Sequence, residues 1–316
     1  KAQKKILDHT AYDTWQFIKK QSISNDGKWI TYALEKNSIS DPLVKLSDFE
    51  GAEARSYPRG TNPKFSFDGT HLFFNIQPAI DDVNQLKRIK TKEEDLPLDT
   101  LGIYNVNTET LSKIPHLISY KIPEKWSDWL VYQHKTPQDT SLKKAKKISK
   151  KTGYELIIGN LIDTARYKYP FVKEYTLSEK GGKIAFTSSG DDAEFQSGVY
   201  VFDTQKQSIQ SIYVSKGIFK SLKWDEAGQH LSFVSDLDTT QSLNRYFNLH
   251  LWSIGDDTAE TILTARDEYL EKTYLVSEHS PLEFSKNGSL LYFGKSLPVL
   301  QADTSLLEHE IVKVEV

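Results

Sequence analysis

A short turn followed by a strand recurs along this 316-residue chain and limits its fold more than any other feature. The first copy, residues 24–32, reads Ser-Asn-Asp-Gly-Lys-Trp-Ile-Thr-Tyr. Asn25, Asp26 and Gly27 favour a tight turn, because short polar side chains bond nearby backbone groups and glycine accepts a positive φ. The Trp, Ile and Tyr that follow suit a pleated, buried surface. Each copy therefore predicts a tight turn, here called an anchor turn, that leads into a buried strand.

The anchor turns are regularly spaced. In the first copy, five residues separate Gly27 from the aromatic Tyr32, and this offset returns four times, from Gly69 to Phe74, Gly181 to Phe186, Gly228 to Phe233 and Gly288 to Phe293. A degenerate copy, residues 126–132, lacks the glycine. Alternating strand patterns lie between the copies, at residues 102–108, 156–164, 198–204, 249–253 and 311–316. Successive anchor turns are 42 to 60 residues apart, which fits a four-stranded propeller blade of roughly 40 to 50 residues plus loops.

The spacing predicts an all-β fold, a β-propeller with about six four-stranded blades. Residues 1–20 form an N-terminal arm and residues 21–316 form the propeller. The six predicted units span residues 23–57, 65–115, 126–167, 175–215, 222–265 and 283–316. The last unit is incomplete, so either the arm completes it or the ring continues in further sequence.

Two insertions interrupt the repeat. Residues 81–95 carry Val83, Leu86 and Ile89 at a spacing of three, which favours a short amphipathic surface helix over a strand. Residues 135–153 contain seven lysines and few apolar residues. We interpret this segment as a solvated loop in preference to a basic docking patch, because such a composition cannot bury a core.

Composition argues against several functional classes. The chain has 40 basic and 43 acidic residues, and this net charge of −3 provides no field for nucleic acid or an anionic membrane. No apolar run approaches the roughly 18 to 20 residues of a spanning helix, and no signal peptide opens the chain. We therefore expect no nucleic-acid partner, no membrane span and an export signal that has been removed. The absence of cysteine excludes disulfides, thiolate metal ligands and thiol nucleophiles.

The sequence contains no strong catalytic or metal-binding motif. An α/β-hydrolase nucleophile needs Gly-x-Ser-x-Gly, which is absent, and Ser296 in Gly-Lys-Ser lies at the end of a strand pattern. The histidines lack zinc-site spacing, and we assign structural roles at strand starts to His71 and His230. The eight histidines are His9, His71, His116, His134, His230, His250, His279 and His309. No glycine-rich phosphate loop exists, and the pair Lys87-Arg88 is too sparse for a nucleic-acid footprint.

Acidic residues are explained by turns and solubility. The pairs are Asp81-Asp82, Glu93-Glu94, Asp191-Asp192 and Asp256-Asp257. Neighbouring residues on a strand point to opposite faces, which disfavours joint acid/base work. The anchor-turn Asp varies to Glu179 or Lys286 between copies, so we predict turn capping in preference to calcium binding. We therefore predict no catalytic, cofactor-binding or metal-binding residue, and no cofactor.

The Ser-x-Asp-Gly-Lys turn and strand resembles the WD40-like repeat of periplasmic propellers. The order of segments further resembles the amino-terminal propeller of bacterial prolyl oligopeptidase family serine peptidases, which include dipeptidyl peptidase relatives. The segments that carry this resemblance are residues 6–9 with Trp15, 23–29, 99–104 and 284–289. The resemblance implies seven or eight blades and a separate α/β-hydrolase domain with a Ser-Asp-His triad, which this chain lacks. It also implies a glutamate pair that binds the substrate amine, but Glu93-Glu94 lies outside a matching motif and does not take that role.

The expected function follows from this resemblance. We expect the non-catalytic propeller of an exported, periplasmic serine peptidase, which caps a hydrolase domain missing from this chain and selects peptide substrates by size. The chain is then a fragment or one domain of a longer enzyme, and peptides are its partners through that domain. The alternative is a stand-alone TolB-like propeller that binds a protein or carbohydrate. TolB-like and lyase propellers share the repeat, so both hypotheses stay open on sequence alone.

Overall fold

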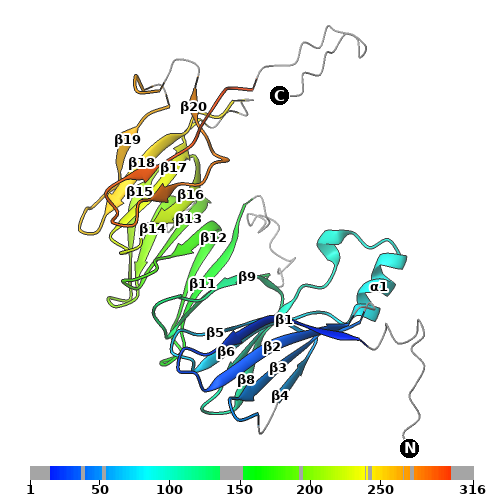
Figure 1. Cartoon of the computed structure of the whole chain (residues 1–316). Coiled ribbons are helices and arrows are strands. Elements are labelled where there is room, and N and C mark those ends of the chain that lie inside the picture. Colours follow the sequence, from blue (N-terminus) through cyan, green and yellow to red (C-terminus); the bar gives the residue numbers. More distant parts are fainter. Residues whose placement is uncertain are drawn as a thin grey trace, which may run out of the picture. The chain divides into compact units, whose positions relative to one another are not determined.

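A computed structural model describes residues 15–36, 40–51, 55–135, 152–191, 195–238, 240, 244–265, 267–270 and 274–299 (Figure 1). The chain divides into two compact units. Unit 1 comprises Lys1–Lys173 and Leu177–Ile184, and unit 2 comprises Glu174–Thr176 and Ala185–Val316.

Unit 1 is built from antiparallel strands that pair in sequence order. The first sheet contains β1 (Gln16–Ile23), β2 (Trp29–Lys36), β3 (Leu43–Asp48) and β4 (Arg55–Pro58). The second contains β5 (Gly60–Phe65), β6 (His71–Ile76), β7 (Thr100–Asn105) and β8 (Thr110–Ile114). A third ladder follows with β9 (Leu117–Lys121), β10 (Trp129–His134), β11 (Tyr154–Asn160) and β12 (Arg166–Leu177).

Unit 2 repeats the same meander. Strands β13 (Lys183–Asp191), β14 (Gln196–Asp203) and β15 (Ser208–Val214) pair in order. A four-stranded sheet follows with β16 (Ile218–Trp224), β17 (His230–Asp236), β18 (Asn248–Ser253) and β19 (Glu260–Leu263). Two short pairs end the described chain, β20 (Leu275–Val276) with β23 (Lys295–Ser296) and β21 (Glu283–Phe284) with β22 (Leu291–Tyr292).

Strand alternation places apolar side chains on both faces of the inner sheets. On β6, the consecutive residues Phe73 and Phe74 are both fully buried. Phe74 packs with Val44 and Leu46 of the first sheet, whereas Phe73 packs with Leu130 of the third ladder. Burying a phenylalanine contributes about 1.5 to 3 kcal/mol. Each sheet is therefore stabilised by its neighbours in the stack.

Two cores of the same kind lie among the described residues of unit 2. The first joins Val199 and Ile212 to Phe233 and Trp252 across adjacent sheets. The second packs residues of β17 and β18 against the two short strand pairs, and contains Val234, Phe247, Leu249, Leu263, Leu270, Val276 and Leu282. The stacked antiparallel sheets are the blades of a β-propeller, so the predicted fold class is confirmed. The predicted unit bounds stay a prediction, although residues 16–20 of the predicted arm lie in β1.

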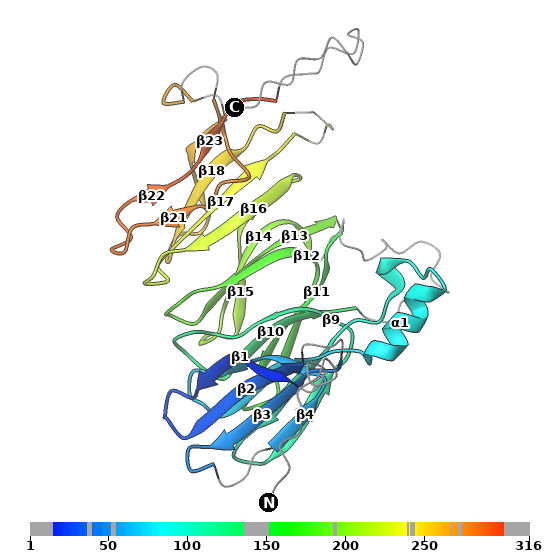
Figure 2. The same ribbon diagram turned by 45° about the vertical axis from the view of Figure 1, so that its right-hand side comes forward.

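The predicted helix in the first insertion is confirmed. Helix α1 (Ile80–Arg88) and the 3-10 helix Glu93–Asp95 lie in the connection between β6 and β7 (Figure 2). Asp81 and Asp82 in the first turn and Lys87 and Arg88 in the last turn complement the helix dipole. Residues 136–151 of the lysine-rich insertion lie outside the described residues. Within the described part of the chain, no helix is long and apolar enough to cross a membrane.

Candidate functional site

The aspartates of the first two anchor turns are occupied by the turns themselves. In the first turn, Asp26 Oδ1 accepts hydrogen bonds from Ser24 Oγ at 2.6 Å and from the Lys28 amide at 3.2 Å. These bonds lower the pKa of Asp26 because they favour its ionised form. In the second turn, Asp68 accepts equivalent bonds from Ser66 and Thr70. The predicted turn-capping role is confirmed for these two residues.

The last anchor turn shows why the aspartate is replaceable. Asn287 Oδ1 accepts from Ser285 Oγ at 2.7 Å and from the Ser289 amide at 3.2 Å, as Asp26 does in the first turn. A neutral amide oxygen therefore satisfies the same donors as a carboxylate. The residue three positions before the turn glycine is the more constant element. Its side-chain oxygen accepts from the amide that starts the next strand, as in Ser24 with Trp29 at 3.0 Å.

This second bond is made in every complete anchor turn. The acceptors are Ser24, Ser66, Ser178, Asp225 and Ser285, and the donors are the amides of Trp29, His71, Lys183, His230 and Leu290. Asp225 fills the serine position of its turn and accepts two amides, those of Gln229 at 2.7 Å and His230 at 3.0 Å. The polar residues of the repeat thus stabilise the turns. Among the described residues, no group of three or more His, Asp or Glu side chains is arranged to hold a metal ion.

The histidines predicted to be structural have local partners. His71 Nδ1 lies 2.8 Å from Thr70 Oγ1, and its Nε2 lies 3.1 Å from Asn105 Nδ2. His230 Nδ1 lies 2.9 Å from Ser253 Oγ. Both residues begin a strand, as predicted from their place after the turn glycine.

The acidic pairs and the candidate serine are not brought together with catalytic partners in the described residues. Asp81-Asp82 and Glu93-Glu94 lie on the exposed faces of the β6–β7 connection. Asp256 accepts the Ser253 amide at 3.2 Å and so closes a turn. Asp192 lies outside the described residues. Ser296 lies in the short strand β23.

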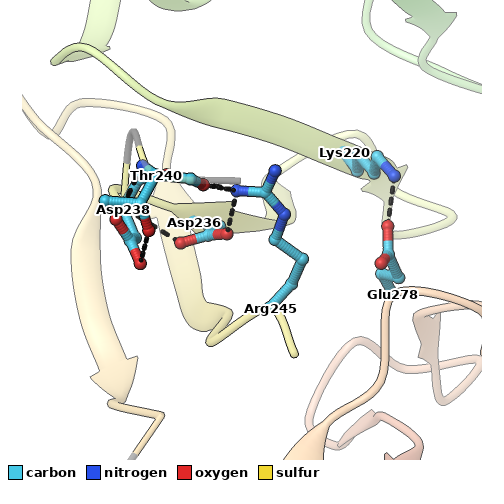
Figure 3. Close-up of polar contacts among 6 residues, drawn as sticks. All are labelled: Lys220, Asp236, Asp238, Thr240, Arg245 and Glu278. Atoms are coloured by element: carbon cyan, nitrogen blue, oxygen red, sulfur yellow. Dashed lines mark hydrogen bonds and ion pairs between the residues drawn. The ribbon is translucent and has the colours of Figure 1, made fainter. Parts of the chain in front are cut away.

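A polar cluster in the connection between β17 and β18 was not predicted from the sequence. Figure 3 shows the Arg245 guanidinium facing Asp236, whose side chain is only 1% exposed, with Nη1 and Oδ2 3.2 Å apart. The same Nη1 donates to the carbonyl oxygen of Thr240 at 2.9 Å. Asp238 caps the Thr240 amide at 2.8 Å. Asp236 and Arg245 are nine positions apart and neither belongs to a repeat, so no sequence pattern predicts their ion pair. This ion pair holds the connection between β17 and β18 in place.

A second missed contact joins two strands of unit 2. The Glu174 carboxylate accepts two consecutive backbone amides, those of Ser221 at 2.9 Å and Leu222 at 2.8 Å. Ser221 has a φ of 60°, and the β16–β17 register shifts between Lys220 and Lys223. The backbone at this bulge therefore forms a cradle for one carboxylate. Lys220 itself pairs with Glu278 (Figure 3).

No protein-family model and no curated protein sequence matches this chain. Solved structures resemble it at low identity. The β-propeller domain of the Trilobed protease from Pyrococcus furiosus is 13% identical over 89% of this chain and 79% of that chain, with a TM-score of 0.43. The acylaminoacyl peptidase of Pyrococcus horikoshii is 11% identical over 90% of this chain, with a TM-score of 0.44, and TolB from Acinetobacter baumannii is 14% identical over 77%, with a TM-score of 0.34. This chain spans 44% of that peptidase and 53% of that TolB.

Proposed function

We propose that this chain is the non-catalytic β-propeller domain of an exported serine peptidase of the prolyl oligopeptidase type. Its role is to cap an α/β-hydrolase domain and to admit peptides by size. The observation that carries the proposal is the anchor-turn repeat, whose order along the chain resembles that of these peptidase propellers. The hydrogen bonds of the first two anchor turns support it, because the repeated polar side chains stabilise the turns of the fold. These side chains are Ser24, Asp26, Ser66 and Asp68.

The chemistry of such an enzyme belongs to its other domain. A nucleophilic serine must be held on a strained turn beside a histidine base. The full sequence here has no Gly-x-Ser-x-Gly turn. A propeller contributes by surrounding a channel that restricts the size of what reaches the hydrolase, and this contribution needs a stable ring more than reactive side chains.

The first experiment assays this chain alone on short peptidyl-proline chromogenic substrates. We expect no turnover that a serine-directed inhibitor abolishes, and robust serine-dependent turnover would overturn the non-catalytic role. The second experiment reads the parent gene. A further few hundred residues with Gly-x-Ser-x-Gly support the peptidase, whereas a stop codon soon after Val316 supports the stand-alone, TolB-like alternative.

A third experiment tests gating in the parent enzyme. Peptide and protein substrates are compared before and after deletion of this domain. We expect deletion to raise the cleavage of an unfolded protein relative to that of a tetrapeptide. An unchanged ratio would contradict size selection. It would not decide whether this chain is a peptidase domain, which the sequence of the parent gene tests.

A further inference from the structure

The last blade of the described chain lacks a strand that its sister blades have. Its second strand, formed by β22 and β23, pairs only with β21 and β20 among the described residues. In the preceding blade, the second strand β17 pairs with β16 on one side and with β18 on the other. The second strands β2, β6, β10 and β13 also have a paired strand on each side. One edge of the last blade therefore has no third strand in the described part of the chain.

The third strand normally covers the aromatic residue that follows each anchor turn by five positions from its glycine. Phe233 of β17 stacks on His250 of the third strand β18, with ring centroids 4.7 Å apart. Phe186 of β13 stacks in the same way on Tyr200 of β14, at 5.6 Å. Both phenylalanines are fully buried, whereas Phe293, at the same position of the last blade, is 39% exposed. The last blade therefore leaves an aromatic ring uncovered beside an unpaired strand edge.

Such an edge is a template for another strand. Its unpaired backbone groups accept a further extended segment, and an adjacent apolar side chain adds a contact for that segment to bury. The residue next to Phe293 strengthens this reading, because Tyr292 is 56% exposed whereas its equivalents Phe73 and Ser232 are fully buried. The surface made by Phe293, Tyr292 and the free edge of β22 and β23 is here called the open edge.

The chain itself contains a segment suited to the open edge. Residues 300–316 lie outside the described residues, and positions 311–316 read Ile-Val-Lys-Val-Glu-Val. In an extended chain the three valines share one face, and the lysine and the glutamate lie on the other. We propose that residues 311–316 pair antiparallel with β22 and β23 as the third strand of the last blade, and that their valine face covers Phe293.

The described chain leads toward this pairing. Beyond β23, the Val299 amide donates to Asn244 Oδ1 at 2.6 Å, and the Val299 carbonyl accepts from Asn244 Nδ2 at 3.1 Å. Asn244 lies in the connection between β17 and β18, so these bonds hold the chain beside the connection that leads into the third strand of the neighbouring blade. Residues 297–310 would form the matching connection of the last blade. They are more numerous than residues 237–247, between β17 and β18, and fewer than residues 77–99, between β6 and β7.

The N-terminal arm is a weaker candidate for the open edge. Residues 16–20 of that arm already pair with β2 as part of β1, in the first blade. The assignment of residues 311–316 does not rest on the proposed function, because a peptidase domain and a stand-alone propeller both need the last blade covered. A closed edge would also prevent association of the chain with itself through β22 and β23.

The test is hydrogen exchange of the 316-residue chain, read by mass spectrometry on peptides covering residues 290–296 and 311–316. We expect both peptides to be protected in the wild type, because amides of paired strands exchange only when the strands open. Val314→Asp places a charge on the apolar face. It should accelerate exchange in both peptides about tenfold or more, since burial of one valine changes an opening equilibrium by at least that factor. The matched variant Lys313→Asp, on the opposite face, should change it by less than about twofold.

A reciprocal variant tests the contact from the other side. Phe293→Ser removes the covered ring and should accelerate exchange of residues 311–316, whereas the same change at the exposed Phe67 of unit 1 should not. An unprotected 311–316 peptide in the wild type would overturn the inference, as would equal effects of Val314→Asp and Lys313→Asp. Protection that increases with protein concentration would also overturn it, because a second copy of the chain would then occupy the open edge.

If the aspartate and serine variants do not fold, the wild-type chain decides. Nuclear Overhauser effects between the Phe293 ring and the methyl groups of the valines at 312, 314 and 316 are expected, and their absence would refute the pairing. None of these measurements uses peptidase activity, so failure here is distinct from failure of the proposed function.

Discussion

Acidification should destabilise unit 2 through His250. This imidazole is fully buried between the rings of Phe233 and Tyr213, with centroids 4.7 Å and 4.6 Å away. Its Nε2 lies 2.7 Å from Ser235 Oγ, and its Nδ1 lies 3.1 Å from Thr261 Oγ1. Burial without a carboxylate partner among these contacts disfavours the imidazolium and lowers the pKa of His250 from 6.5 to about 4.

The sign follows from proton binding. Between pH 6.5 and about 4, the unfolded chain binds a proton at His250 that the folded chain does not. The stability from this site is complete above pH 6.5 and falls as the pH drops through that window. At pH 5 the loss is about 2 kcal/mol, and below pH 4 it reaches about 3 kcal/mol, at 1.36 kcal/mol per pKa unit.

The assay is urea unfolding at pH 8 and pH 5, followed by tryptophan fluorescence, for the wild type and His250→Gln. The glutamine cannot titrate, and any packing cost it adds is present at both pH values. All other ionisable groups are shared, so the wild type should lose about 2 kcal/mol more than the variant between the two pH values. An equal loss in both proteins would refute the reasoning.

Three further predictions concern stability, each measured by urea unfolding. Asp26→Ala should cost about 1 kcal/mol by orphaning the Ser24 and Lys28 donors, whereas Asp26→Asn should be nearly neutral because Asn287 makes the same bonds in the last turn; equal costs would contradict this. Asp236→Asn should lower the free energy of unfolding by about 2 kcal/mol, because the aspartate is buried. Glu278→Gln, in the more exposed ion pair, should lower it by less than about 1 kcal/mol. A larger loss for Glu278→Gln than for Asp236→Asn would contradict this prediction. Phe74→Ala should cost about 3 to 5 kcal/mol, and Phe67→Ala, 42% exposed, much less; similar values would show that the blade interface is not packed as described.

The repeat, and with it the fold class, could be predicted from the order of the amino acids. A tight turn needs only a few consecutive residues, and the Ser, Asp and Gly of the first anchor turn each bond to a backbone group within five positions in the sequence. Strand burial likewise follows an alternation that is visible in a short window. The helix α1 was readable for the same reason, since three apolar residues at a spacing of three define one helix face.

The contacts between polar groups that are distant in sequence could not be predicted, because they depend on how the strands pack. Glu174 reaches amides 47 and 48 positions away, and it does so through strand packing that no local pattern encodes. The bulges of β1, β5 and β16 could not be predicted either, because Lys20, Asn62 and Ser221 have different side chains but the same left-handed backbone. His250 reads as one residue of an alternating strand, and its burial between two aromatic rings depends on β15 and β17. Side-chain chemistry over short spans fixes turns and strands, but sites are made by distant residues whose contacts exist only once the blades have packed.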